Sequence, residues 1–211
     1  MSLLDRRSLP RLYPILVPTR IGAGALTEIV EFVNQLAIGG ATFIQLREKQ
    51  ASSREILLLA RELRRVLPQN VRLILNDRAD LCLAAGADGV HVGQDDLPPE
   101  AARRLVGAKL VVGVSTHNPE QVESADGSAA DYVAVGPVFS TISKDNPDPV
   151  IGLEGVKRAR ALTQKPLIAI GGITLENCRS VIDAGADSVA VISDLLLDPR
   201  KRTAAFLKKM R

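Results

Sequence analysis

The stretch that decides the fold is "LILNDRADLCLAAGADGVHVGQDD", residues 73–96. It holds two short apolar runs, and each run ends in polar and acidic residues: Asn76-Asp77 after the first and Gln94-Asp95-Asp96 after the second. A segment of helical character separates the two runs. Strand, helix and strand in this order predict one βαβ unit of a parallel sheet, with both acidic clusters at the carboxyl ends of their strands.

Apolar runs of the same kind recur along the whole chain. Between them lie stretches with helical spacing, such as "SSREILLLARELRRVL", which opens with capping serines, and "TLENCRSVIDAG", which begins near Thr174 and closes on Gly185. Strands with so little polar alternation are typical of a parallel sheet covered by helices. The predicted strands are 12–17, 42–47, 72–77, 89–93, 110–116, 132–138, 166–172 and 188–193.

Eight strand–helix units in 211 residues match a compact (β/α)8 TIM barrel that forms one domain over residues 1–211. An open, doubly wound sheet is the alternative. A weak internal repeat favours the closed ring, because "AAGADGVHVG" at 84–93 and "DAGADSVAVI" at 183–192 share a helix end, a glycine cap and a strand. The fragments "IGGATFIQL" and "SAADYVAVG" echo the same pattern.

Acidic residues that follow neighbouring strands of a barrel meet on one rim. Parallel neighbours lie about 4.8 Å apart, so Asp77 can share a cation with Asp95 or Asp96. A small number of oxygen ligands favours Mg²⁺ that also holds a substrate phosphate. The alternative is that Asp77 and Asp96 cap the helices that follow them.

Cationic and polar residues end another strand, in "QLREK". Alternation along a strand puts Gln45, Arg47 and Lys49 on one face, where arginine offers a two-pronged phosphate contact and lysine a mobile charge. The alternative is an exposed strand end. After the sixth predicted strand, the long polar loop in "GPVFSTISKDNPDPVIG" is typical of a lid, and its Thr141, Ser143 and Lys144 could donate to anions; an ordinary surface loop is the alternative.

The last two predicted strands suggest a second phosphate pocket. Gly171-Gly172 ends the seventh strand and Ile192-Ser193 the eighth, and the loops at these places often bind phosphate in such barrels. A glycine pair selected for packing alone is the alternative.

Composition excludes several classes of function. A net charge of +3 and 3% aromatic residues are too little for a nucleic-acid binder, and the basic clusters 200–202 and 208–209 are interpreted as the solvated face of a last helix. The N-terminal residues do not resemble a signal peptide, and no apolar run has membrane-spanning length, so a cytoplasmic protein is expected.

The remaining reactive side chains do not form a known catalytic pattern. Cys82 and Cys178 are expected to be reduced core thiols, His91 a hydrogen-bonded barrel residue, and His117 part of a helix start. No nucleophile triad or zinc spacing occurs in the sequence. The chemistry should therefore depend on a metal ion and on cationic side chains.

Taken together, the motifs "QLREK", "NDR", "GVHVGQDD", "GVSTH", "GPVFSTISK", "AIGGI" and "VAVIS" resemble those of the thiamine phosphate synthase family. They cover residues 12 to 193 in family order, and they are specific as a set. The resemblance implies a (β/α)8 barrel that joins a pyrimidine methyl diphosphate to a thiazole phosphate. Diphosphate leaves first, a pyrimidinylmethyl cation forms, and the thiazole nitrogen attacks it.

The resemblance also implies roles for individual residues. Asp77 and Asp96 would bind the Mg²⁺ cofactor. Lys144, Arg47, Lys49 and Ser115 would be catalytic, and the partners would be small molecules, with the chain a monomer or homodimer. The pyrimidine diphosphate would be held by Gln45, Arg47, Lys49, Asn76, Ser115 and Lys144, and the thiazole phosphate by Thr141, Ser143, Gly172, Ile192 and Ser193.

Two departures from the family pattern stand out: the first strand reads "LYPILVPT" instead of an "LYLITD"-like start, and Ser143 replaces a common threonine. Two rival functions remain at this point. One is a thiazole tautomerase of similar fold, which would not need the diphosphate and metal residues. The other is a non-catalytic phosphate-binding barrel, which gives no reason for both Asp77 and Asp96.

Overall fold

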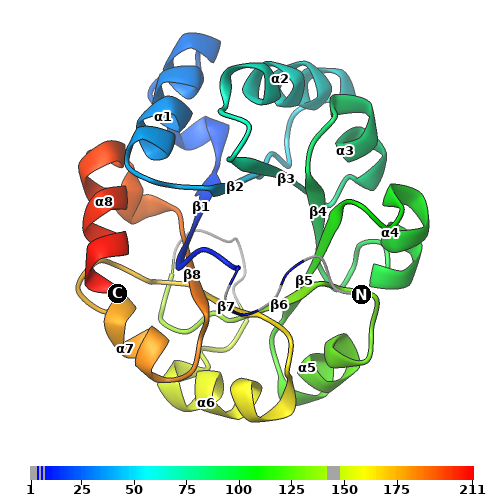
Figure 1. The fold of residues 1–211 in the computed structure, drawn as a ribbon, viewed down its shortest axis with the longest axis vertical. Helices are drawn as coiled ribbons and strands as arrows, with labels where there is room; N and C mark the ends of the chain where they lie inside the picture. Colours follow the sequence, from blue (N-terminus) through cyan, green and yellow to red (C-terminus); the bar gives the residue numbers. More distant parts are fainter. Residues whose placement is uncertain (1–3, 5, 7, 142–147) are drawn as a thin grey trace.

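The structure is a computed structural model that describes residues 4, 6, 8–141 and 148–211. Eight parallel strands close into a ring in sequence order, and the helices surround it (Figure 1). The (β/α)8 barrel predicted from the sequence is therefore confirmed, and the open doubly wound sheet is excluded, since β1 pairs with β8 through Leu12 and Val189. Residues 142–147, which include Ser143 and Lys144, lie outside the described part.

All eight strands were anticipated, and each is slightly shorter than its apolar run. Most are buried on both faces, as parallel strands between a barrel interior and a ring of helices must be. The strands are β1 Leu12–Leu16, β2 Phe43–Leu46, β3 Arg72–Asn76, β4 Gly89–Val92, β5 Val111–Thr116, β6 Tyr132–Val135, β7 Leu167–Ile170 and β8 Ser188–Val191.

The helices follow the strands in strict alternation. The Ser52 side chain caps α2 as expected, accepting a hydrogen bond from the Glu55 N–H at 3.3 Å. One prediction is wrong: α7 begins at Cys178, not near Thr174, because Asn177 Oδ1 accepts the Thr174 N–H and holds the preceding residues in a turn. The helices are α1 Leu26–Ile38, α2 Ser53–Val66, α3 Ala79–Ala85, α4 Pro99–Val106, α5 Pro119–Asp126, α6 Gly152–Leu162, α7 Cys178–Asp183 and α8 Pro199–Lys209, with short 3₁₀ turns η1 Pro18–Arg20 and η2 Ser193–Leu195.

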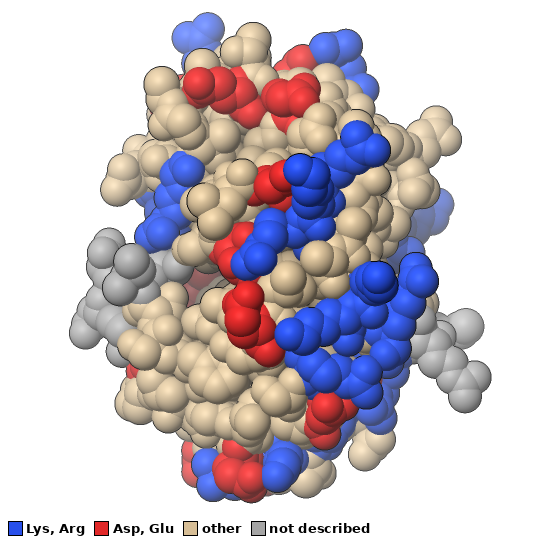
Figure 2. Space-filling model, turned by 90° about the vertical axis from the view of Figure 1, so that its left-hand side faces the viewer, with Lys and Arg blue, Asp and Glu red and all other residues tan. Residues whose placement is uncertain are grey.

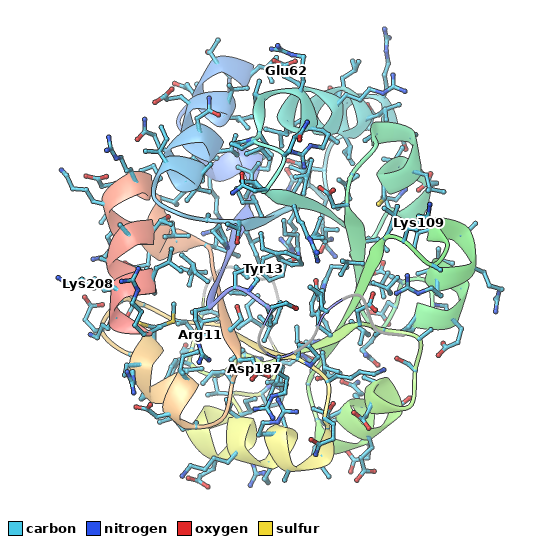
Figure 3. The ribbon with its side chains drawn as sticks, in the orientation of Figure 1. Arg11, Tyr13, Glu62, Lys109, Asp187 and Lys208 are labelled. Atoms are coloured by element: carbon cyan, nitrogen blue, oxygen red, sulfur yellow. The ribbon has the colours of Figure 1, made fainter. Side chains whose placement is uncertain are left out.

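The apolar core has two parts. The larger lies between the strands and the helices and includes both cysteines, which are buried free thiols as predicted. The smaller fills the barrel interior, where Tyr13, Phe43 and Tyr132 meet edge to face, with Tyr13 near the centre of the ring in Figure 3. Leu4 and Leu9 from the N-terminal segment belong to this inner cluster, so that segment packs against the barrel interior.

Three carboxylates, of which those of Asp131 and Asp187 are buried and that of Asp88 is half-buried, secure the N-terminal ends of alternate strands, and we call these contacts the Arg–Asp clamps. In each clamp the aspartate stands just before β4, β6 or β8. It accepts one hydrogen bond from an arginine of α2, α4 or α6, and another from a backbone N–H of the intervening strand, β3, β5 or β7. The guanidinium also donates to backbone carbonyls of the same connection. The clamps are Arg64–Asp88–Leu73, Arg103–Asp131–Val112 and Arg160–Asp187–Leu167.

The third clamp carries extra contacts from the N-terminal segment. Arg6 Nε lies 2.9 Å from Asp187 Oδ1, and Arg11 Nη1 donates to the Asp187 carbonyl at 3.2 Å. Figure 3 shows Arg11 beside Asp187 on this side of the barrel. The start of the described chain is thereby tied to the strand that closes the ring.

The basic residues of α8 are mostly solvated, as expected. Lys208 points away from the barrel in Figure 3, and Lys and Arg gather over part of the face that carries α8 in Figure 2. Arg202 is the exception to the sequence interpretation, because it is half-buried and forms an ion pair with Asp194 of η2. Over the described residues, no helix has the length and apolar character to span a bilayer.

Candidate active site

A cavity of about 710 Å³ opens at the carboxyl ends of the strands. Every site residue predicted from the sequence that falls in the described part of the chain lines it. This volume is in the range of small-molecule sites in proteins. The predicted residues on its wall are Gln45, Arg47, Lys49, Asn76, Asp77, Asp96, Ser115, Thr141, Gly172, Ile192 and Ser193.

The two predicted metal ligands lie side by side. Asp77 follows β3 and Asp96 follows β4, and their carboxyl groups are within hydrogen-bond reach of each other. Asp96 Oδ2 accepts the Gly93 N–H at 2.8 Å, and Lys49 Nζ lies 3.3 Å from Asp77 Oδ2. Neither carboxylate caps a helix, since the residues that precede α3 and α4 as caps are Arg78 and Pro98.

The environment of Asp77 is unfavourable for a carboxylate without a cation. Burial and, after it, the neighbouring Asp96 together raise the pKa of Asp77 to about 6, with Lys49 opposing the shift. Asp77 also has a left-handed backbone, with φ of 63°. Asparagine and aspartate tolerate this conformation better than other non-glycine residues. A strained backbone and a paired, partly desolvated carboxylate are typical of a functional site.

The donor set suits Mg²⁺ better than a metal held by protein alone. Within the described residues, no three His, Cys, Asp or Glu side chains group as a metal cluster. Mg²⁺ commonly takes one or two carboxylates from the protein and fills its other positions with water and phosphate oxygens. Asp77 and Asp96 supply that number. Beside them, the buried Asn76 Nδ2 has no hydrogen-bond partner among the residues that the structure describes, so it is available to a ligand.

The residues of "QLREK" face the cavity together. Gln45, Arg47 and Lys49 all line its wall, and of the three the Lys49 side chain is the exposed one. Gln45 is buried, and its Nε2 donates to the Tyr13 hydroxyl at 2.8 Å. Arg47 continues beyond β2, where its backbone N–H donates to the Leu16 carbonyl at 2.9 Å. Lys49 therefore stands next to Asp77, and Arg47 lines the same cavity.

Gly172, Ile192 and Ser193 lie on the wall built by β7 and β8. Gly172 has φ of 61°, and a Cβ there would overlap the Ser140 carbonyl oxygen and approach Phe139 Cβ to 2.8 Å. Packing against the β6–α6 loop therefore requires this glycine, whatever else it does. Thr141, at the end of the described part of that loop, lines the same cavity.

Contacts to Asp194 from the β7–α7 loop and from α8 stabilise the 3₁₀ turn η2, which begins at Ser193. Asp194 Oδ2 accepts the Leu175 N–H at 2.7 Å, and Arg202 of α8 forms an ion pair with the other carboxylate oxygen. Sequence reasoning missed this link because Arg202 stands in a run of exposed basic residues. The arginine holds Asp194, and Asp194 joins the loops that follow β7 and β8.

A chain of buried polar side chains crosses the floor of the cavity, and the sequence did not predict it. Tyr13 OH lies 3.1 Å from Tyr132 OH, which lies 2.8 Å from His91 Nδ1. His91 Nε2 lies 2.8 Å from Ser115 Oγ. The interpretation of His91 as a hydrogen-bonded barrel residue is confirmed. Burial lowers its pKa to about 4, with Arg47 acting in the same direction and Asp96 against it.

The second histidine lies on the cavity wall. The His117 N–H donates to Gln121 Oε1 at 2.7 Å, but the residue that caps α5 is Asn118. Its ring is turned inward, with Nδ1 2.6 Å from the Gly136 carbonyl oxygen and 3.4 Å from Asp148 Oδ2. His117 thus takes part in the start of α5 through its backbone, as expected, while its ring lines the cavity.

The barrel and this cavity define a class: a (β/α)8 enzyme whose rim carries paired carboxylates, cations and glycine-rich turns suited to phosphorylated substrates. A family model for thiamine monophosphate synthase matches residues 12–195. A thiamine-phosphate synthase of Koribacter versatilis is 60% identical over 95% of each chain, and one of Chlorobium phaeovibrioides is 48% identical over 83% of this chain and 85% of its own. A solved thiamine phosphate pyrophosphorylase from Pyrococcus furiosus is 36% identical, with a TM-score of 0.83 over 95% of each chain. The chain belongs to the thiamine monophosphate synthase family.

Proposed function

We propose that the protein is a thiamine phosphate synthase, a transferase that joins 4-amino-2-methyl-5-(diphosphooxymethyl)pyrimidine to 4-methyl-5-(2-phosphooxyethyl)thiazole and releases diphosphate. The observation that carries this proposal is that one cavity combines two anion-binding walls. Carboxylates and cations line the wall beyond β2 to β4, and the turns after β7 and β8 line the other. The names of the relatives agree with this assignment.

The wall beyond β2 to β4 would hold the diphosphate. Arg47 and Lys49 offer charge-assisted hydrogen bonds to phosphate oxygens, and Asn76 Nδ2 is a buried donor that needs an acceptor. As diphosphate departs, negative charge grows on its oxygens. Cations fixed beside them stabilise that charge more than they stabilise the bound substrate, which lowers the barrier.

Asp77 and Asp96 would hold Mg²⁺ against the same phosphates. The raised pKa of Asp77 supports this role, because a divalent cation offsets the repulsion between the two carboxylates. When bound, Mg²⁺ supplies Lewis-acid stabilisation of the leaving diphosphate. Lys49, 3.3 Å from Asp77, can then turn toward phosphate oxygens, since its charge would no longer be needed by the carboxylate.

The opposite wall would hold the thiazole phosphate through Thr141, Gly172, Ile192 and Ser193. The thiazole nitrogen would attack the pyrimidinylmethyl cation with its lone pair. This attack needs no general base, so the proposed reaction requires no proton abstraction by the protein. The protein's task is then to orient two substrates and to stabilise charge.

Further parts of the proposal rest on the family resemblance. Lys144 would assist diphosphate departure, together with Ser115, and Ser143 would bind the thiazole phosphate. The chain would act as a single domain over residues 1–211, as a monomer or homodimer in the cytoplasm, with small molecules as its partners.

The direct test is to incubate the purified protein with both substrates and Mg²⁺ and to measure thiamine phosphate and diphosphate by chromatography. We expect both products in equal amounts and none in EDTA. A thiazole tautomerase would instead change only a thiazole substrate, and a binding barrel would retain ligand without turnover. Either result would contradict the proposal.

A substitution on one wall should weaken the binding of one substrate only. We expect Arg47→Ala to raise the KM for the pyrimidine diphosphate, since each lost charge-assisted bond is worth about 1.5 to 3 kcal/mol, or roughly 10-fold to 150-fold. The KM for the thiazole phosphate should stay near its original value. Ser193→Ala should show the reverse pattern. Ser193 is a better probe than Gly172, because any side chain at Gly172 would collide with the protein itself.

Steady-state kinetics with each substrate varied in turn measure this crossed pattern. Calorimetric titration of each variant with diphosphate and Mg²⁺ provides a second readout that does not depend on turnover. Equal losses for both substrates in both variants would contradict two separate walls.

A further inference from the structure

The polar chain on the cavity floor joins five strands. Tyr13 comes from β1, Gln45 from β2, His91 from β4, Ser115 from β5 and Tyr132 from β6. The first three and Tyr132 are buried, and Ser115 is half-buried at the cavity end of the chain. Four contacts of 2.8 to 3.1 Å connect them in the order Gln45, Tyr13, Tyr132, His91 and Ser115.

The position of Tyr132 is built into the barrel. A Cβ at Gly113 of β5 would overlap the Tyr132 ring, so the absence of a side chain there makes room for the phenol. The ring then stacks on His91 at a centroid distance of 5.5 Å and an interplanar angle of 19°. Its hydroxyl reaches His91 Nδ1 without leaving the interior.

The donor and acceptor groups of these side chains fix the direction in which the hydrogen bonds run. The Gln45 Nε2 amide group can only donate, so the Tyr13 hydroxyl accepts from it. Among the contacts of the described residues, the acceptor for Tyr13's own hydrogen is the Tyr132 oxygen. The hydrogen of Tyr132 then goes to His91 Nδ1. If Tyr132 donated to Tyr13 instead, the buried Tyr13 hydroxyl would accept twice and its own hydrogen would have no acceptor. An unsatisfied buried donor costs about 1 to 3 kcal/mol.

This direction fixes the state of the imidazole. Nδ1 accepts, so a neutral ring carries its hydrogen on Nε2 and donates it to Ser115 Oγ. The burial that lowers the pKa of His91 also favours the neutral ring. With its oxygen occupied by the imidazole, the Ser115 hydroxyl is left with a hydrogen to donate into the cavity.

We propose that His91 is a positioning residue: held as the Nε2–H tautomer by Tyr132, it orients Ser115 so that the serine hydroxyl donates to an acceptor atom of the pyrimidine substrate, a ring nitrogen or a phosphate oxygen. The substrate in this statement rests on the proposed function, whereas the tautomer does not. Tyr132 acts on His91 directly, and Tyr13 and Gln45 set the direction of the hydrogen bonds that reach it.

The chain contains two histidines, which makes the tautomer directly measurable. With ¹⁵N-labelled histidine, long-range ¹H–¹⁵N correlation spectra at neutral pH distinguish the nitrogen that carries the hydrogen. We expect Nε2–H for His91. His117 is an internal control, because its Nδ1 faces the Gly136 carbonyl, which can only accept, so it must carry a hydrogen on Nδ1. The His117→Gln variant assigns the two sets of signals.

The Tyr132→Phe variant tests the consequence, because it keeps the aromatic ring and removes the hydroxyl. We expect the His91 spectrum to lose its pure Nε2–H pattern and kcat/KM for the pyrimidine diphosphate to fall about tenfold, the effect of one hydrogen bond. In a Ser115→Ala background, Tyr132→Phe should add no further loss, since His91 acts through the serine hydroxyl. Ser115→Thr, which keeps the hydroxyl, should recover most of the activity lost in Ser115→Ala.

An Nδ1–H tautomer of His91 in the unaltered protein would overturn the proposal, and so would a full additional loss in the double variant. The spectrum of the unaltered protein gives the first answer even if Tyr132→Phe fails to fold. If the protein made no thiamine phosphate but showed Nε2–H on His91, the proposed function would fail while the assigned tautomer held.

Discussion

Asp77→Asn should lower turnover by about a hundredfold or more while making the metal-free protein more stable at neutral pH. The loss of activity follows because one of the two carboxylates proposed to hold Mg²⁺ becomes a neutral amide, and metal stabilisation of a leaving group is worth several kcal/mol. Asparagine suits the left-handed backbone at this position as well as aspartate does, so the fold should be kept. Kinetics with added Mg²⁺ measure the first effect.

The gain in stability follows from the sign of the pKa shift. The folded protein raises the pKa of Asp77 to about 6, above the value of an unfolded chain, so ionised Asp77 opposes folding at higher pH. This cost shrinks as pH falls from about 6 to about 4 and is gone below that, where the carboxyl is protonated in both states. Asp77→Asn should therefore raise the melting temperature at pH 8, and the gain should vanish below about pH 4.

Asp80→Asn is the matched control. Asp80 lies on α3, three residues further along, and its ion pair with Arg78 lowers the pKa of that carboxyl. Its replacement should slightly destabilise the protein at neutral pH and leave turnover unchanged. If Asp77→Asn lowered the melting temperature at pH 8 in the same way, the account of a strained carboxylate pair would be wrong.

Asp187→Ala should destabilise the protein by about 3 to 5 kcal/mol, because it removes one partner of a buried ion pair and leaves the other without compensation. Asp187 accepts from Arg160 at 2.8 Å, from the Leu167 N–H at 2.9 Å and from Arg6 at 2.9 Å. In a protein of this size the melting temperature should drop by roughly 10 °C. Thermal unfolding followed by circular dichroism measures it.

The exposed pair Arg179–Asp183 provides the comparison. Its side chains are 50% and 57% exposed, whereas those of Arg160 and Asp187 are 15% and 8% exposed. Asp183→Ala should cost about 1 kcal/mol or less, as exposed ion pairs usually do. Equal losses in the two variants would mean that the clamp adds nothing beyond a surface charge pair.

The sequence predicted the strands well because each one is buried on both faces and reads as an uninterrupted apolar run. It also predicted that Asp77 would lie beside Asp95 or Asp96, since residues that follow adjacent parallel strands must lie on one rim. Local patterns carry these two pieces of information, whereas the choice of Asp96 came from the family resemblance. The start of α7 was wrong because Asn177 competes with the helix for backbone hydrogen bonds, and helical spacing does not report such a contact.

The floor of the cavity could not be predicted in this way. Tyr13 and Tyr132 are 119 residues apart, and only closure of the ring brings their hydroxyl groups together. A lone tyrosine in an apolar strand looks like any core aromatic. The one clue was the combination of buried Gln45, Tyr13 and His91 in strands that should face inward, because buried polar groups need partners.

The Arg–Asp clamps give the barrel a rotational regularity. Each clamp closes the same unit of helix, strand, helix and strand, and the three units lie one after another from α2 to β8. The fourth unit of the ring combines α8 with β1, α1 and β2, so the two ends of the chain fall inside it. In this fourth unit the matching fragment is "IGGATFIQL", which has Thr42 at the position of the aspartate in the other three units. The barrel therefore repeats one quarter-turn unit around its axis, and the quarter that joins β8 to β1 and β2 has a threonine where the other three have the carboxylate of an ion pair.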